Sequence, residues 1–117
     1  MALEHVYRVM TLVPPDGMEG VIEGVISVAN LAVGHYDRVL WWSSPGTEQY
    51  LPLSGANPRT ADIGELRRDP TVRLEFSIPR DEAMLNLVVD EGIRPAHPYE
   101  EPVIVVTEAF ADIASGD

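Results

Sequence analysis

The sequence contains no cysteine and no lysine, and each absence excludes a class of chemistry. Without cysteine the chain has no disulfide, no thiolate nucleophile and no thiolate zinc site. Without lysine it has neither the phosphate-binding lysine of a P-loop nor a Schiff-base amine. Its 8 basic residues are all arginines, set against 19 acidic residues, which gives a formal net charge of −11. Because nucleic-acid binding requires a basic face, we expect no nucleic-acid partner.

Long hydrophobic runs are missing as well. No apolar stretch approaches the roughly 18 residues of a membrane-spanning helix. The N-terminus has neither the basic segment nor the apolar core of a signal peptide. We therefore predict a cytoplasmic protein with no membrane partner. With 117 residues, of which 45% are hydrophobic, the chain has the size and composition of a single domain covering residues 1–117.

Hydrophobic spacing predicts six elements, because alternating or β-branched segments indicate strands and three- and four-residue intervals indicate helices. The predicted elements are a strand at 5–13, a helix from 18 to about 34, strands at 38–44 and 72–78, a helix from 81 that ends before Gly92, and a strand at 102–109. A long loop, 45–70, separates the second and third strands. This β-α-β-β-α-β order predicts an α+β ferredoxin-like plait, an antiparallel four-stranded sheet with both helices on one face.

Two glycines, Gly20 and Gly24, lie inside the first predicted helix. Each costs roughly 1 kcal/mol relative to alanine in a helix interior, and their four-residue spacing places both on one face. Either another part of the backbone approaches this face closely, or the helix merely tolerates the pair. The second interpretation is simpler and is favoured from the sequence alone.

One face of a ferredoxin-like sheet carries no helix, and this sequence makes that face apolar. Residues 103–106 (Val-Ile-Val-Val) are apolar on both faces of the last strand, and the adjacent Trp41 and Trp42 must point to opposite faces. Uncovered apolar edges and faces promote aggregation. We therefore predict a homo-oligomer that buries the open face. The alternative is that the 45–70 loop folds back over it.

Among the three histidines, His97 has the most suggestive neighbours. It precedes Glu100 and Glu101 by three and four residues, and imidazole with carboxylate is a donor set for a divalent metal ion. Prolines within and after this segment exclude helical geometry, so the ligands cannot converge as they would on one helix face. In the alternative interpretation the two glutamates anchor backbone N–H groups of a loop, and Tyr99 packs as an amphipathic lid.

Five motifs occur in an order that resembles a known family. They are Gly34-His35-Tyr36-Asp37, Pro45-Gly46-Thr47, the segment 50–58 (Tyr-Leu-Pro-Leu-Ser-Gly-Ala-Asn-Pro), Arg73-Leu74-Glu75 and His97-Pro98-Tyr99-Glu100-Glu101-Pro102. From about residue 5 to 108, the chain resembles the domain inserted into YqfO-type (Nif-three-like) proteins, also known as type 2 GTP cyclohydrolase I. It is more distantly similar to the CutA divalent-cation tolerance proteins and to PII signalling proteins. The resemblance implies a βαββαβ plait and a trimer whose sheets face inward.

The resemblance also limits which functions transfer. In YqfO-type proteins the paired metal ions lie in the domain that flanks the insert. This sequence corresponds to the insert as a stand-alone chain, so hydrolase activity is not expected to transfer. We predict a PII/CutA-like homo-oligomer, a trimer, that binds a small ligand or a divalent metal ion without catalysis. The predicted site residues are His97, Glu100 and Glu101 as metal ligands, with His35, Tyr36 and Tyr99 as further ligand-site candidates.

Two alternatives remain open at this point. The chain could be an interaction module that regulates a separate metal-dependent hydrolase of the YqfO kind. It could also be a small enzyme that uses His97 or His35 as a general base beside a carboxylate. No nucleophile or cofactor motif accompanies either histidine, so the sequence favours a binding protein over an enzyme.

Overall fold

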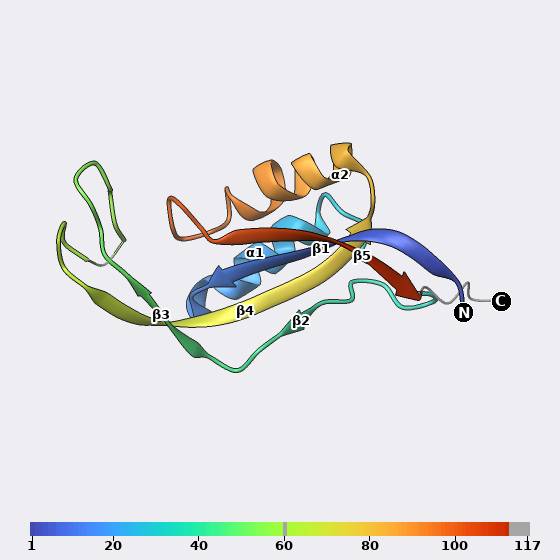
Figure 1. Cartoon of the computed structure of the whole chain (residues 1–117), viewed down its shortest axis with the longest axis horizontal. Helices are drawn as coiled ribbons and strands as arrows, with labels where there is room; N and C mark the ends of the chain where they lie inside the picture. Colours follow the sequence, from blue (N-terminus) through green and yellow to red (C-terminus); the bar gives the residue numbers. More distant parts are fainter. Residues whose placement is uncertain (60, 113–117) are drawn as a thin grey trace.

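The computed structural model describes residues 1–59 and 61–112. Its sheet is antiparallel and follows the spatial order β2-β4-β1-β5, with β3 paired to one end of β4 (Figure 1). The strands are β1 (Leu3–Val13), β2 (Trp41–Trp42), β3 (Gly46–Tyr50), β4 (Arg67–Pro79) and β5 (Ile104–Asp112). The predicted α+β ferredoxin-like fold is confirmed, with the last strand at a sheet edge. The sheet has five strands rather than four, because β3 is an additional strand.

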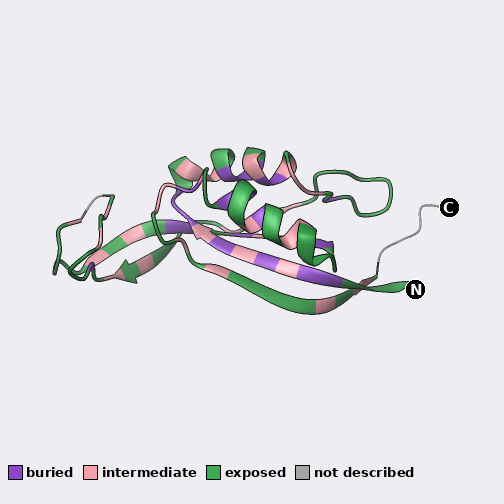
Figure 2. Ribbon diagram, turned by 90° about the horizontal axis from the view of Figure 1, so that it is seen from above, coloured by how far each residue is buried: buried purple, intermediate pink, exposed green. Residues whose placement is uncertain are grey.

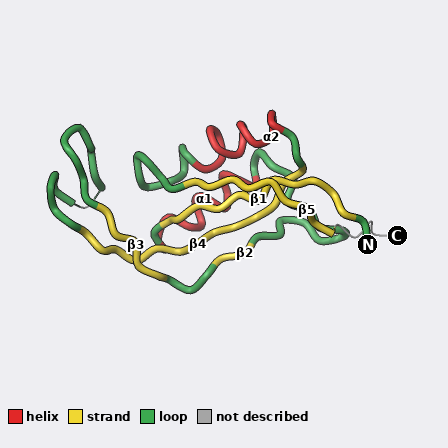
Figure 3. The backbone as a smooth tube through the Cα atoms, in the orientation of Figure 1, coloured by secondary structure: helices red, strands yellow, loops and turns green. Residues whose placement is uncertain are grey.

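The helices lie on one face of this sheet, as predicted (Figure 3). They are α1 (Met18–Ile26), which follows the short turn η1 (Pro15–Gly17), and α2 (Glu82–Leu87), which continues into the π-helical turn η2 (Val88–Ile93). Alternate residues of the central strands face the helices, so Val9 lies opposite Phe76 and both are fully buried. Figure 2 shows these buried positions along the central strand and on the inner sides of the helices. In the described part of the chain, no helix is long and apolar enough to cross a membrane.

Both helices end differently from the prediction. The first helix ends at Ile26 instead of near residue 34, and the Asn30 side chain instead accepts a hydrogen bond from the N–H of Ala32 at 3.0 Å. Such local side-chain bonds compete with helical ones. The second helix begins as expected, where the Asp81 carboxylate accepts hydrogen bonds from two backbone N–H groups of the first turn. α2 itself ends at Leu87, but the chain continues directly into the π-helical turn η2, so Gly92 lies inside helical structure instead of directly after it.

Gly24 of α1 and Gly92 of η2 lie in close backbone contact. A Cβ atom added at Gly24 would lie 2.2 Å from the carbonyl oxygen of Gly92, whereas one added at Gly20 would lie 3.8 Å from the carbonyl oxygen of Ala96. The two helical segments therefore approach through backbone at Gly24. The tolerated-pair interpretation of the glycines is wrong for Gly24, which is required by a close contact.

The predicted 45–70 loop is not a loop throughout. Residues 46–50 form β3 and pair with residues 67–71 of β4, which lengthens β4 well beyond the predicted strand. Pro70 is accommodated because this part of β4 pairs with β3 and has no register partner on β1, whose last pair joins Val13 to Val72. We refer to the described residues between 46 and 71 as the arm. The arm extends away from the helix-covered part of the sheet (Figure 1).

The face of the sheet opposite the helices carries both apolar and charged residues. Met10 pairs with Val105 on one side and with Glu75 on the other, and Glu75 also pairs with Trp41. Trp41 is 51% exposed and Val105 is 46% exposed. The described part of the arm extends beyond the sheet (Figure 1) and leaves Trp41 and Val105 exposed, so the alternative that the 45–70 segment folds back over this face is wrong for those residues.

Candidate functional site

The outer half of the arm borders an open cavity of about 570 Å³. Three segments form it: the end of β3, the following connection at 51–59, and the segment 99–101 that precedes β5. We call it the arm cavity. Its polar lining residues are Glu48, Tyr50, Ser54, Asn57, Arg59, Tyr99, Glu100 and Glu101. A volume of this size is typical of sites for small organic molecules.

Two side-chain contacts hold the 51–59 connection over the cavity. The Asn57 backbone N–H donates a hydrogen bond of 2.6 Å to Oε1 of Glu100. The Arg59 guanidinium donates two bonds to the Asp16 carboxylate, of 2.7 and 3.3 Å, and this pairing lowers the pKa of Asp16. Glu100 thus anchors a loop backbone N–H group, and the anchoring interpretation is confirmed for this residue.

Glu48 contributes a buried acceptor to the cavity wall. Its Oε1 atom is shielded from solvent and has no hydrogen-bond partner in the structure. Burial raises the pKa of Glu48. A hydrogen bond with Thr71 opposes this rise, and the negative charge of Asp69 adds to it, so the pKa remains above its ordinary value. Native proteins rarely leave a buried polar atom without a partner, so each such atom calls for an explanation.

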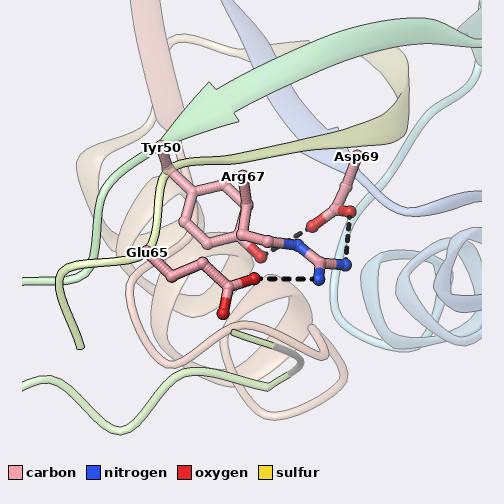
Figure 4. A network of polar contacts seen from close by, with 4 residues as sticks. All are labelled: Tyr50, Glu65, Arg67 and Asp69. Carbon is pink, nitrogen blue, oxygen red and sulfur yellow. Dashed lines mark hydrogen bonds and ion pairs between the residues drawn. The ribbon is translucent and has the colours of Figure 1, made fainter. Parts of the chain in front are cut away.

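Aromatic rings line the same cavity. The ring centroids of Tyr50 and Tyr99 are 6.2 Å apart. Burial raises the pKa of Tyr99, and nearby Glu48 raises it further, so its hydroxyl stays protonated at neutral pH. The Tyr50 hydroxyl donates a 2.7 Å hydrogen bond to Asp69. Arg67 then links Asp69 and Glu65, at 3.1 and 3.3 Å, so the tyrosine is held on the arm by a polar network (Figure 4).

His97 is buried, with 7% of its surface exposed, and both its ring nitrogens are engaged. Nε2 lies 2.7 Å from the carbonyl oxygen of Leu12, and Nδ1 accepts a 3.0 Å hydrogen bond from the backbone N–H of Tyr99. A carbonyl can only accept, so the ring is neutral with its proton on Nε2. His97 therefore fastens the segment that begins at residue 97 to the end of β1.

The predicted metal site is not assembled in this conformation. A metal ligand needs a free ring nitrogen, and in His97 both are occupied, so its prediction as a ligand is not supported. Within residues 1–59 and 61–112, no group of three or more histidine or acidic side chains is arranged to hold a metal ion. Glu100 and Glu101 do line the arm cavity.

The other candidates divide between two ends of the molecule. Tyr99 lies in the arm cavity together with Glu100 and Glu101. His35 and Tyr36 belong to the connection between α1 and β2, which extends toward the end of the molecule that holds the N-terminus (Figure 1). His97 contacts the C-terminal end of β1. The structure therefore does not bring His35 and His97 into one site. Glu48 and Tyr50, which complete the cavity, were missed by the sequence analysis.

The state of His97 predicts a pH dependence of stability. Burial lowers its pKa, opposed by the hydrogen bond to Leu12, so the unfolded chain takes up the proton first. The contribution of neutral His97 to the free energy of unfolding is complete above the ordinary histidine pKa of about 6.5. It decreases as the pH falls below that value. We expect urea denaturation between pH 8 and pH 5 to show this loss, and His97→Gln to show less of it. Identical pH profiles for both proteins would contradict the assignment.

Comparisons with known proteins agree with this fold. No protein-family model matches the chain. The GTP cyclohydrolase 1 type 2 homolog of Mycobacterium tuberculosis is 34% identical over 90 residues, which is 77% of this chain and 23% of the relative. The chain thus spans about a quarter of the length of the curated relatives it matches. The Bacillus cereus protein related to NIF3 superposes with a TM-score of 0.73 at 27% identity, over 93% of this chain and 27% of that one.

A second group of structures shares the fold along most of its own length. The divalent ion tolerance protein CutA1 from Ehrlichia chaffeensis superposes with a TM-score of 0.62 at 11% identity, covering 91% of this chain and 82% of that protein. At this identity the likeness concerns the fold alone. The chain is therefore similar, over most of its length, to one segment of the GTP cyclohydrolase 1 type 2 (NIF3-related) proteins, and it has the fold of the CutA1 proteins.

Proposed function

We propose that the chain is a non-enzymatic, PII/CutA-like module that self-associates and binds a small molecule in the arm cavity. The observation that carries this proposal is the cavity of about 570 Å³, which is lined by Glu48, a residue whose Oε1 is buried and unpartnered. A buried acceptor without a partner destabilises a folded protein. A ligand that donates a hydrogen bond to it would remove that penalty.

The absence of catalysis is part of the proposal and is supported by His97. Both of its nitrogens are held by backbone groups, so it is not available to move a proton to or from a substrate. A divalent ion remains a candidate ligand through Glu100 and Glu101, which line the arm cavity. A cytoplasmic location is part of the proposal.

Self-association is supported by the open sheet face. Trp41 of β2, Met10 of β1 and Val105 of β5 lie there in one cross-strand row, with Glu75 of β4 between Trp41 and Met10. The family resemblance implies a trimer. We expect sedimentation velocity to show an oligomer that Trp41→Glu converts to monomer, because the new charge would be buried in the interface. Tyr36→Glu, at a position that is 78% exposed near the opposite end from the arm, serves as the control. A wild-type chain that sediments as a monomer at all concentrations would contradict the proposed self-association.

Ligand binding is tested by titrating the isotope-labelled chain with a panel of divalent metal chlorides, nucleotides, small amines and small carboxylates. We expect at least one compound to shift the backbone amide signals of Gly55 and Tyr99 in a saturable way. Tyr99→Leu should weaken that response at least tenfold, whereas Tyr36→Leu should not change it. A panel that leaves the cavity signals unmoved would overturn the ligand-binding function.

The second candidate is a regulatory module that partners a metal-dependent hydrolase. It is favoured by the observation that the chain matches about a quarter of a longer relative. Co-sedimentation with a purified GTP cyclohydrolase 1 type 2 homolog would support it, and separate sedimentation would count against it.

A further inference from the structure

We infer that the ligand of the arm cavity is a small organic cation, whose ammonium or guanidinium group binds Glu48 beside the rings of Tyr50 and Tyr99. This inference rests on the proposed ligand-binding function and names the chemical class of the ligand. Three properties of the cavity lead to it: the charge of its lining, the unsatisfied acceptor, and the combination of aromatic rings with a large volume.

The lining is negatively charged. Among the described lining residues, three are carboxylates (Glu48, Glu100 and Glu101) and one is a cation, Arg59. The charge of Arg59 is already matched by two hydrogen bonds to Asp16, which does not line the cavity. An anionic ligand such as a phosphate would therefore face uncompensated carboxylates, whereas a cation would be attracted.

The unpartnered atom specifies a donor. Oε1 of Glu48 is shielded from solvent and accepts no hydrogen bond, so a ligand in the cavity reaches it when the carboxylate turns toward the cavity. A carboxylate accepts most strongly from a charged N–H donor. Glu100 is already committed through Oε1 to the Asn57 backbone. Glu48 is consequently the carboxylate of the wall with a buried oxygen left to satisfy. Its position on β3, inside the paired part of the arm, fixes it more firmly than a loop would.

The rings and the volume favour an organic cation over a bare metal ion. Tyr50 and Tyr99 present two aromatic rings with centroids 6.2 Å apart, and an ammonium or guanidinium group is attracted to such faces within about 6 Å. The described residues offer no cluster of three metal-ligating side chains. A cavity of about 570 Å³ also leaves room for a carbon chain or ring beside the charged group.

The experiment is isothermal titration calorimetry with agmatine, which carries a guanidinium and an ammonium group, with succinate as the anionic probe and MgCl₂ as the metal probe. We expect saturable binding of agmatine and no response to succinate. Glu48→Gln, which keeps the shape and removes the charge, should weaken agmatine binding at least tenfold. Glu91→Gln, an exposed carboxylate on η2, makes the same change in net charge and should leave the affinity within twofold of wild type.

The outcomes separate this inference from the function on which it rests. Binding of succinate or MgCl₂ without agmatine would overturn the organic cation and leave a ligand-binding module. Equal agmatine affinity in wild type and Glu48→Gln would overturn the role of Glu48. A third outcome is that none of the three probes binds and that no compound of the broader panel shifts the amide signals of Gly55 and Tyr99. In that case both the inference and the proposed function fail.

Discussion

Gly24→Ala is expected to lower the free energy of unfolding by about 3 kcal/mol, an overpacking effect at the upper end of the usual range. The added methyl carbon would lie 2.2 Å from the carbonyl oxygen of Gly92 and 3.2 Å from its carbonyl carbon. Both atoms belong to backbone inside the π-helical turn η2, so no side-chain rotation can relieve the clash. The two helical segments must move apart, which loosens the core beneath them. Urea denaturation followed by circular dichroism measures the loss.

Gly20→Ala is the matched control, because it makes the same chemical change one turn earlier in α1. Its methyl carbon would lie 3.8 Å from the carbonyl oxygen of Ala96, an ordinary contact distance. The greater helix propensity of alanine should then raise the free energy of unfolding by up to about 1 kcal/mol. A Gly24→Ala protein as stable as Gly20→Ala would mean that α1 and η2 do not approach as closely as the structure has them.

The fold could be predicted because its information is local. Residues 72–78 alternate apolar and polar side chains, and the structure buries their apolar positions Val72, Leu74, Phe76 and Ile78 against the helices. Once the order of strands and helices is known, handedness rules leave few topologies. The missed features depend on distant partners. Strand β3 is stabilised by residues 67–71, about twenty positions away, and the prolines of that region indicate a loop when they are taken alone.

The candidate site was predictable in part for the same reason. The segment 97–101 was identified from its residue types, and the anchoring of a loop N–H by Glu100 was one of the two interpretations. The residue types did not reveal that the Leu12 carbonyl, 85 positions away, occupies His97. Nor did they reveal Glu48 and Tyr50, which reach the cavity through the pairing of β3 with β4. Residues 46–50 (Gly-Thr-Glu-Gln-Tyr) do not alternate apolar and polar side chains, so the sequence carried no periodic signal for this strand.

His97→Ala is expected to cost about 3 kcal/mol of stability and to release the cavity wall. Removing the ring leaves the Leu12 carbonyl and the Tyr99 N–H without their partners. Each lost partner of a buried group costs about 1–3 kcal/mol, and the emptied space adds to this. Because the Tyr99 N–H is one of the groups released, its hydrogen exchange should accelerate beyond the change expected from global stability.

The exposed His5, which stacks on Phe110 near the other end of β1, provides the control for this substitution. His5→Ala should change stability by less than about 0.5 kcal/mol and leave the exchange of the Tyr99 amide unaltered. If His97→Ala were destabilised while Tyr99 exchanged no faster than global unfolding requires, the ring would serve only as packing. Faster local exchange would instead establish that one neutral histidine couples the end of the central strand to the wall of the arm cavity. That wall carries Tyr99, Glu100 and Glu101. The loss of His97 would then weaken the binding of any ligand of the cavity, although His97 itself does not contact the ligand.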